Sequence, residues 1–173
     1  MRRDLKTAEQ ILVRDLRTGQ DQERELYRAT TLSSYIATIA LSPDGQELAF
    51  VSNDQSTHSN VLAVMPTAGG EPRELLRLKE PEFMYSPEGL AWTPDGREVL
   101  FVKHLSYSPQ DQRTELWRIS AEGGKPRRLE LAMEDLRSLR FHPDGRRIAF
   151  TTGQSKAEVW VLDNFLPVLK AAK

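Results

Sequence analysis

The sequence predicts an all-β fold built from a repeated unit of four antiparallel strands. Three observations lead to this prediction. A short pattern occurs three times, apolar residues alternate within it with a period of two, and two kinds of glycine turn recur between the alternating stretches. The three copies are Ile39–Phe50, Leu90–Phe101 and Leu139–Phe150. Since strand side chains alternate between two faces, each copy indicates two half-buried strands joined by a turn.

The turn inside each copy reads Pro-Asp-Gly. Apolar residues precede the proline by four and two positions and follow it by five and seven. Proline presets the backbone of the first central turn position, aspartate tolerates the second, and glycine adopts the left-handed conformation that closes the hairpin. We therefore expect a structural role and a positive φ at each glycine. The predicted turn residues are Pro43, Asp44, Gly45, Pro94, Asp95, Gly96, Pro143, Asp144 and Gly145.

A second turn, made by two adjacent glycines, joins a third strand to a fourth. It is Gly69-Gly70 in the first unit and Gly123-Gly124 in the second, and a Pro-Arg pair follows each turn. The third strands are predicted at 61–65 and 116–119, and the fourth strands are more polar. The unit is therefore four strands in about 50 residues.

Partial copies occupy both ends of the chain. Residues 11–28 contain a third and a fourth strand without the first two, and residues 158–163 form a third strand without a fourth. The predicted organisation is a half unit at 11–28, units at 32–78 and 88–131, an incomplete unit at 136–163 and a tail at 164–173.

Four-stranded units of this length, arranged radially, are the blades of a β-propeller. The Pro-Asp-Gly core, followed by an Ala/Leu-Phe pair and by Gly-Gly-x-Pro-Arg, resembles the TolB-type, WD-repeat-like propeller repeat over residues 11–165. It is also similar to blades in the N-terminal domain of prolyl-oligopeptidase-type peptidases. The resemblance implies a partial β-propeller with about three complete four-stranded antiparallel blades plus incomplete blades at both ends.

The resemblance also implies a ring of six or seven blades, which this chain is too short to close. We expect the chain to be the C-terminal segment of a longer, bacterial-type propeller protein, with Met1 inside a blade. The alternative is that a second copy of the chain supplies the missing blades. An open arc would expose strand edges, which proteins normally cover.

Composition narrows the range of partners. The 24 basic and 25 acidic residues give a net charge of -1, so no basic field exists to bind nucleic acid. The absence of cysteine excludes disulfides and thiolate sites. The apolar stretch near the N-terminus, at 11–13, is too short for a signal peptide, and the longest apolar run, at 61–65, is too short for a membrane span. We expect a protein partner, no nucleic acid and no membrane insertion. The sequence does not decide the compartment, which is the cytoplasm or, for a longer exported chain, the periplasm.

No catalytic constellation emerges from the residue pattern. His142 belongs to the repeat, while His58 and His104 have no companion at a metal-ligand spacing. The nearest approach to a nucleophile elbow, at 153–157, lacks the second glycine. We therefore predict no catalytic residue, no metal and no cofactor.

The candidate functional surface is one end of the strands. Since both glycine turns emerge at the opposite end, this end carries the longer loops, at 29–35, 52–60, 79–88 and 103–114. We call it the long-loop face. Aromatic side chains on loops above a rigid scaffold suit protein recognition. The candidate partner-binding residues are Tyr35, His58, Phe83, Tyr85, His104 and Tyr107.

Two functions remain open. The first is a non-enzymatic scaffold or sensor module that binds a protein through the long-loop face. The alternative, implied by the resemblance, is the gating propeller of a prolyl-oligopeptidase-type serine peptidase whose hydrolase domain is absent. The sequence also leaves open whether Phe83, Met84 and Tyr85 contact a partner or fill the space between blades. For Trp92, Trp117 and Trp160 we expect packing within or between blades.

Overall fold

The computed structural model describes residues 9–14, 23–29, 34–84, 89–108, 111–142 and 144–153. Every regular element in these ranges is a β-strand, and no helix that could cross a membrane is found there. Tyr85, Pro143 and the third strand predicted at 158–163 lie outside the described residues. The strands are β1 (Gln10–Arg14), β2 (Glu23–Arg28), β3 (Ser34–Leu41), β4 (Glu47–Asp54), β5 (Ser59–Pro66), β6 (Arg73–Lys79), β7 (Leu90–Trp92), β8 (Glu98–His104), β9 (Arg113–Ser120), β10 (Arg127–Glu134), β11 (Arg137–Phe141) and β12 (Ile148–Thr151).

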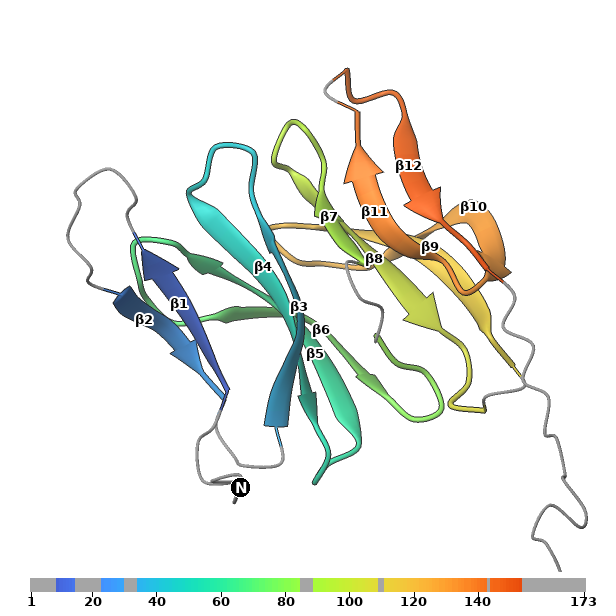
Figure 1. The fold of residues 1–173 in the computed structure, drawn as a ribbon, viewed down its shortest axis with the longest axis horizontal. Helices are drawn as coiled ribbons and strands as arrows, with labels where there is room; N and C mark the ends of the chain where they lie inside the picture. The colour runs from blue at the N-terminus through green and yellow to red at the C-terminus, as the bar shows by residue number, and fades with distance from the viewer. Residues whose placement is uncertain are drawn as a thin grey trace, which may run out of the picture.

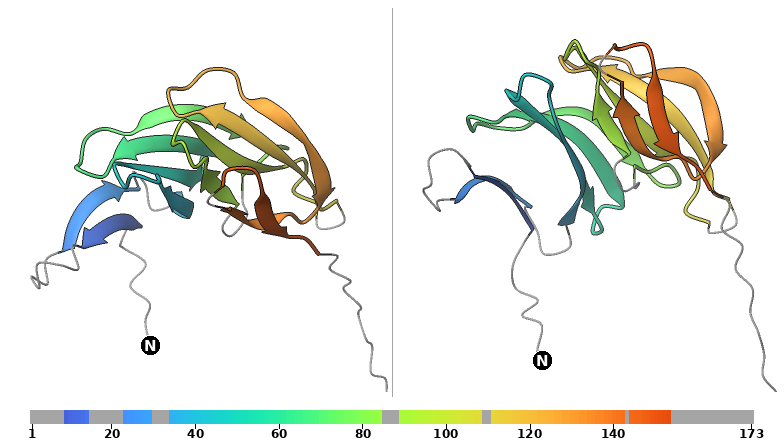
Figure 2. Two further views of the ribbon diagram at one scale, coloured as in Figure 1. Left: turned by 90° about the horizontal axis from the view of Figure 1, so that it is seen from above. Right: turned by 45° about the horizontal axis from the view of Figure 1, so that its top comes forward.

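The strands form four antiparallel sheets in which neighbours follow chain order (Figure 1). Strands β3–β6 make one four-stranded sheet, blade 1, and strands β7–β10 make another, blade 2. Two-stranded sheets flank them: β1–β2, the leading pair, and β11–β12, the trailing pair. Figure 2 shows the sheets following one another along an open arc. The predicted partial propeller is confirmed, with two complete blades among the described residues.

The Pro-Asp-Gly segments form the predicted turns. Gly45, Gly96 and Gly145 have φ values of 72°, 69° and 69°, so the expected left-handed conformation is confirmed at all three. In the first turn the Gly45 N–H donates to the Ser42 carbonyl over 2.9 Å, and the Ser42 N–H donates to the Glu47 carbonyl over 2.8 Å. Each turn therefore closes the hairpin between the first and second strands of its blade.

The aspartate of the turn does more than tolerate its position. The Asp44 carboxylate accepts hydrogen bonds from the Ser42 hydroxyl over 2.7 Å and from the Gln46 N–H over 3.0 Å. Asp95 repeats this arrangement with the Thr93 hydroxyl over 2.6 Å and the Arg97 N–H over 3.1 Å. These hydroxyl hydrogen bonds are the main reason that the pKa of Asp44 and that of Asp95 lie below the ordinary value. The carboxylate thus bridges both sides of the turn.

The largest core lies between the two complete blades. Val51 and Leu62 of blade 1 pack in the same cluster as Val99 and Phe101 of blade 2. Trp92, only 5% exposed, belongs to this core, and its indole N–H donates to the Ala40 carbonyl on β3 over 2.9 Å. The expected packing role of Trp92 is therefore observed, and it joins the first strands of neighbouring blades.

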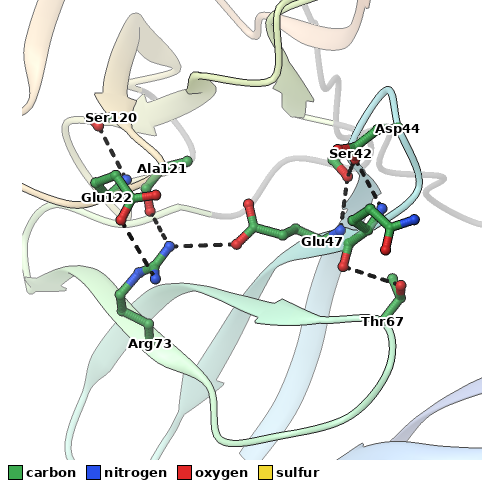
Figure 3. Close-up of polar contacts among 9 residues, drawn as sticks. Ser42, Asp44, Glu47, Thr67, Arg73, Ser120, Ala121 and Glu122 are labelled. Atoms are coloured by element: carbon green, nitrogen blue, oxygen red, sulfur yellow. Dashed lines mark hydrogen bonds and ion pairs between the residues drawn. The ribbon is translucent and has the colours of Figure 1, made fainter.

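Arg73 connects the outer parts of the same two blades (Figure 3). This first residue of β6 donates from Nη2 to the Ala121 carbonyl over 2.7 Å. Its guanidinium also lies 3.6 Å from the Glu47 carboxylate of its own blade and 3.8 Å from that of Glu122. Because Ala121 and Glu122 belong to the turn between β9 and β10, the Pro-Arg element of the repeat holds blade 2 against blade 1.

Candidate functional site

The long-loop face contains a pocket of about 440 Å³. It opens where the β4–β5 turn, the segment after β6 and the segment after β8 meet. Three of the predicted site residues, from three different segments, line it. The lining residues are Tyr35, Asn53, Asp54, Gln55, His58, Ser59, Asn60, Glu80 and Tyr107.

Tyr107 rests on a stack of rings. The Phe83 ring lies 3.9 Å from the Tyr107 ring, measured between centroids, at an angle of 15°. Phe83 also stacks with His104, with 4.6 Å between the ring centroids and 16° between the ring planes. Phe83 is 9% exposed whereas Tyr107 is 50% exposed, so Phe83 supports a ring that faces outward. The stack brings together three residues that the sequence had placed only on the same face.

A short backbone bridge holds this stack in place. The Phe83 N–H donates to the His104 carbonyl over 3.1 Å, and the His104 N–H donates back over 2.8 Å. His104 is the last residue of β8, which corrects its expected place in a loop. The bridge is isolated from the pairing of β7 with β8, which ends at Phe101, and it holds the segment between the blades against blade 2.

Met84 fills the space between the blades. It is 2% exposed and belongs to the core cluster shared by blades 1 and 2. Of the two roles that the sequence left open for this segment, packing applies to Met84. Tyr85 lies outside the described residues, so its predicted role in partner binding stays a prediction.

His58 stands at the rim of the pocket. Its backbone is left-handed, with a φ of 48°, and its Nδ1 lies 2.9 Å from the Glu80 carboxylate. Its side chain is 70% exposed. The histidine therefore joins the β4–β5 turn to the segment after β6 while most of its ring faces solvent.

Two buried asparagines form the floor, and sequence reasoning missed both. Asn53 and Asn60 are opposite each other on β4 and β5, and each is 4% exposed. The Asn60 side-chain amide donates to the side-chain oxygen of Asn53, and the Asn60 side-chain oxygen accepts the Met84 N–H over 2.6 Å. Asn53 Nδ2 has no hydrogen-bond partner among the described residues. The sequence did contain a signal for this pair, because two asparagines stand at the facing ends of two neighbouring strands.

Asn60 also contacts the exposed tyrosine. Burial raises the pKa of the Tyr107 hydroxyl, while a hydrogen bond between that hydroxyl and the Asn60 side chain acts in the opposite direction. One buried amide thus links β4, the segment between the blades and the segment after β8. The base of the pocket is held together by hydrogen bonds, and an exposed aromatic ring lies above it.

Comparison with known proteins gives structural neighbours only. No family model matches the sequence, and no curated protein matches it. TolB from Acinetobacter baumannii superposes with a TM-score of 0.62 and 19% identity over 85% of this chain. The chain has the fold of a partial β-propeller, and we call it the propeller segment. The propeller segment covers only 33% of that TolB chain.

Two peptidase structures resemble the propeller segment in the same way. A prolyl endopeptidase gives a TM-score of 0.58 and 21% identity over 84% of the segment. An acylaminoacyl peptidase gives a TM-score of 0.53 and 17% identity over 85% of the segment. The segment covers 22% and 24% of these two chains. At such identities the likeness establishes the fold and not the activity.

The pocket of the propeller segment is polar and carries two carboxylates. The pKa of Asp54 lies below its ordinary value, chiefly because the Ser56 hydroxyl donates to the carboxylate. Glu80 faces His58 at the other side. Among the described residues no group of three or more histidines, aspartates or glutamates is placed to hold a metal ion. The arrangement suits hydrogen bonding and stacking with a polar or cationic group.

Proposed function

We propose that the propeller segment is a non-enzymatic scaffold or sensor module whose protein partner docks on the long-loop face. The observation that carries the proposal is the pocket beside Tyr107, in which Tyr35, His58 and Tyr107 converge from separate segments. A tyrosine supplies a large contact area at a low cost in side-chain entropy, which explains the frequency of tyrosine in protein interfaces.

The support beneath Tyr107 strengthens this proposal. Its ring is held from below by Phe83 and its hydroxyl by Asn60, so that little ordering remains for a partner to impose. Asp54 and Glu80 add negative charge at the pocket wall. A partner segment with a basic side chain next to a flat or apolar group would complement both features.

The proposal is tested by affinity capture with the immobilised chain, followed by quantitative mass spectrometry. Tyr107→Ala is expected to reduce the captured partner at least severalfold, while the melting temperature stays near that of the unchanged protein. Tyr107→Phe, which keeps the stacked ring, is the matched variant and should retain most of the capture. Arg97→Ala, at the opposite end of the blade, serves as the surface control. An identical partner profile for Tyr107→Ala and the unchanged chain contradicts the proposal.

The second candidate is the gating propeller of a prolyl-oligopeptidase-type peptidase. Its support is the similarity in fold to the prolyl endopeptidase and acylaminoacyl peptidase structures. The two candidates differ in what accompanies the propeller. An α/β-hydrolase coding region next to this reading frame favours the gating role, and its absence favours the binding module.

A further inference from the structure

Blade 1 exposes apolar side chains at positions that blade 2 buries. Ile39 and Leu41 of β3 are 53% and 58% exposed. They precede the turn proline by four and two residues, as Leu90 and Trp92 do in β7, and those two are 3% and 5% exposed. Leu90 and Trp92 are covered because blade 1 packs against them. The corresponding face of β3 has no such neighbour among the described residues.

The leading pair covers only the outer part of this face. Ile11 and Tyr27 pack with Phe50 of blade 1, but β1 pairs only with β2 in the described part of the chain. Leu12, which points away from this cluster, is 47% exposed. Between β1 and β3 lies an apolar hollow of about 400 Å³. Since β1 and β2 correspond to third and fourth strands, this hollow is the place of a first and a second strand.

The trailing pair has the opposite half of a blade: it provides the strands that the leading pair lacks. β11 and β12 are a first and a second strand, and in the described ranges β12 pairs only with β11. Ala149 and Thr151 are exposed. They follow the turn proline by six and eight residues, as Ala49 and Val51 do in β4, and these are 0% and 1% exposed against blade 2. The trailing pair therefore presents the face that normally meets the next blade.

We propose that a second copy of this chain docks its trailing pair into the hollow of the first copy. The Ala149 and Thr151 face of one copy covers Ile39 and Leu41 of the other. The edge of β12 that faces away from β11 pairs with the edge of β1 that faces away from β2. Two strands from each copy then form one composite blade. The contact continues an interface already present in the molecule, because it uses the same repeat positions as the packing of blade 1 on blade 2.

Reciprocal docking closes a ring. The described part of each copy provides two complete blades and one half of each of two composite blades, so that two copies make six blades. This number lies within the range of four to eight that closed propellers commonly have. In a face-to-face dimer the same surface of each copy would meet, whereas this contact joins two different surfaces. A two-fold axis repeats the contact once, and the two contacts together close the ring.

Two other occupants compete with the second copy. The predicted third strand at 158–163 would take the same edge of β12 within its own chain. A longer parent chain would place its own first and second strands in the hollow. The second copy is favoured for this chain because the chain itself carries a strand pair with the required positions exposed.

The first test is the solution mass of the full 173-residue chain, measured by light scattering over a wide concentration range. The expected species contains two copies of the 19.7 kDa chain. Ile39→Glu with Leu41→Glu should give the monomer with an unchanged circular dichroism spectrum, because both side chains lie on the surface. Ile39→Ser with Leu41→Ser is the milder variant if the charged one does not fold. Tyr107→Glu, on the long-loop face, should leave the mass unchanged.

The second test separates docking between different surfaces from a face-to-face contact. Ala149→Glu with Thr151→Glu should also be monomeric. An equimolar mixture of the β3 variant and the β12 variant should regain the dimer mass, because one intact contact remains in each mixed pair. The proposal is overturned by a monomeric unchanged chain at every concentration, by a β12 variant that stays dimeric, or by open assemblies of more than two copies.

Discussion

Arg73 donates a hydrogen bond to the backbone carbonyl of Ala121, which lies 48 residues further along the chain, over a distance of 2.7 Å (Figure 3). The two residues belong to different blades. Ala121 is 4% exposed, so its carbonyl has little access to water and depends on the guanidinium. A single arginine therefore joins the start of a fourth strand to the turn of the next blade.

Replacing Arg73 by alanine is expected to destabilise the protein by about 1 to 2 kcal/mol, since the Ala121 carbonyl loses a charged donor. The ion pairs with Glu47 and Glu122 add little because the Arg73 side chain is 45% exposed. Urea unfolding measures the loss. Arg77→Ala is the control: its closest pairing is with Glu74 of the same strand, and it should cost less than about 0.5 kcal/mol. Equal losses for the two variants contradict the assignment.

Gly96→Ala is expected to cost about 1 to 2 kcal/mol, because a side chain is strained at a φ of 69°. Sterics add little, since the nearest atom to an added Cβ would be the Pro43 Cδ at 3.9 Å. Gly153→Ala is the matched control, because Gly153 is not in the left-handed region and its added Cβ would have only ordinary contacts. The difference between the two variants in thermal unfolding tests whether the backbone conformation is the cause.

The turns and the alternation of apolar residues were predictable because they are local. Gly45, Gly96 and Gly145 adopt the conformation that the Pro-Asp-Gly sequence requires. The contacts of Arg73 and Trp92 were not predictable, because each joins residues about 50 positions apart through the way in which blades stack. Repetition in a sequence identifies the unit, whereas the contacts between units depend on the three-dimensional arrangement.

Asp95 should make stability depend on pH in the acidic range. Its pKa is lowered mainly by the Thr93 hydroxyl, so its contribution is present above the unfolded value of about 3.9 and is lost as the pH falls through the lower folded value. Asp95→Asn is therefore expected to melt below the unchanged protein at neutral pH. The difference should narrow below about pH 4. Melting curves over this range check the prediction, and a constant gap would count against it.

The candidate site was only partly predictable. The long-loop face follows from strand direction, and the structure brings Tyr35, His58 and Tyr107 to one pocket. The buried amides were missed because Asn60 acts through contacts with residues outside its own strand. Asn53 becomes its neighbour when β4 and β5 pair, and Met84 reaches it from the segment after β6. Polar residues at strand ends have the same appearance in a sequence whether they face solvent or form a buried network.

Asn60→Ala is expected to destabilise the protein by about 1 to 3 kcal/mol, because the buried Met84 N–H loses its acceptor. The same change should loosen Tyr107, which loses its hydrogen bond. Gln55→Ala, an exposed neighbour in the same pocket, should be nearly neutral. Chemical unfolding gives the energies. Comparable stability of the two variants would show that the asparagine network does not stabilise the pocket.

Trp92→Phe tests the contact between the first strands of neighbouring blades. Phenylalanine keeps an aromatic ring in the core but cannot donate to the Ala40 carbonyl, so we expect a loss of about 1 to 3 kcal/mol from the missing hydrogen bond and the smaller side chain. Trp117→Phe is the matched control. The Trp117 indole N–H donates to Glu115 within the same strand, and its ring is only partly buried, so this variant should lose less. Because the Trp92 contact crosses between blades and the Trp117 contact does not, a larger loss for Trp92→Phe in urea unfolding would assign the difference to blade stacking. The reverse order would place the main stabilisation within the blade.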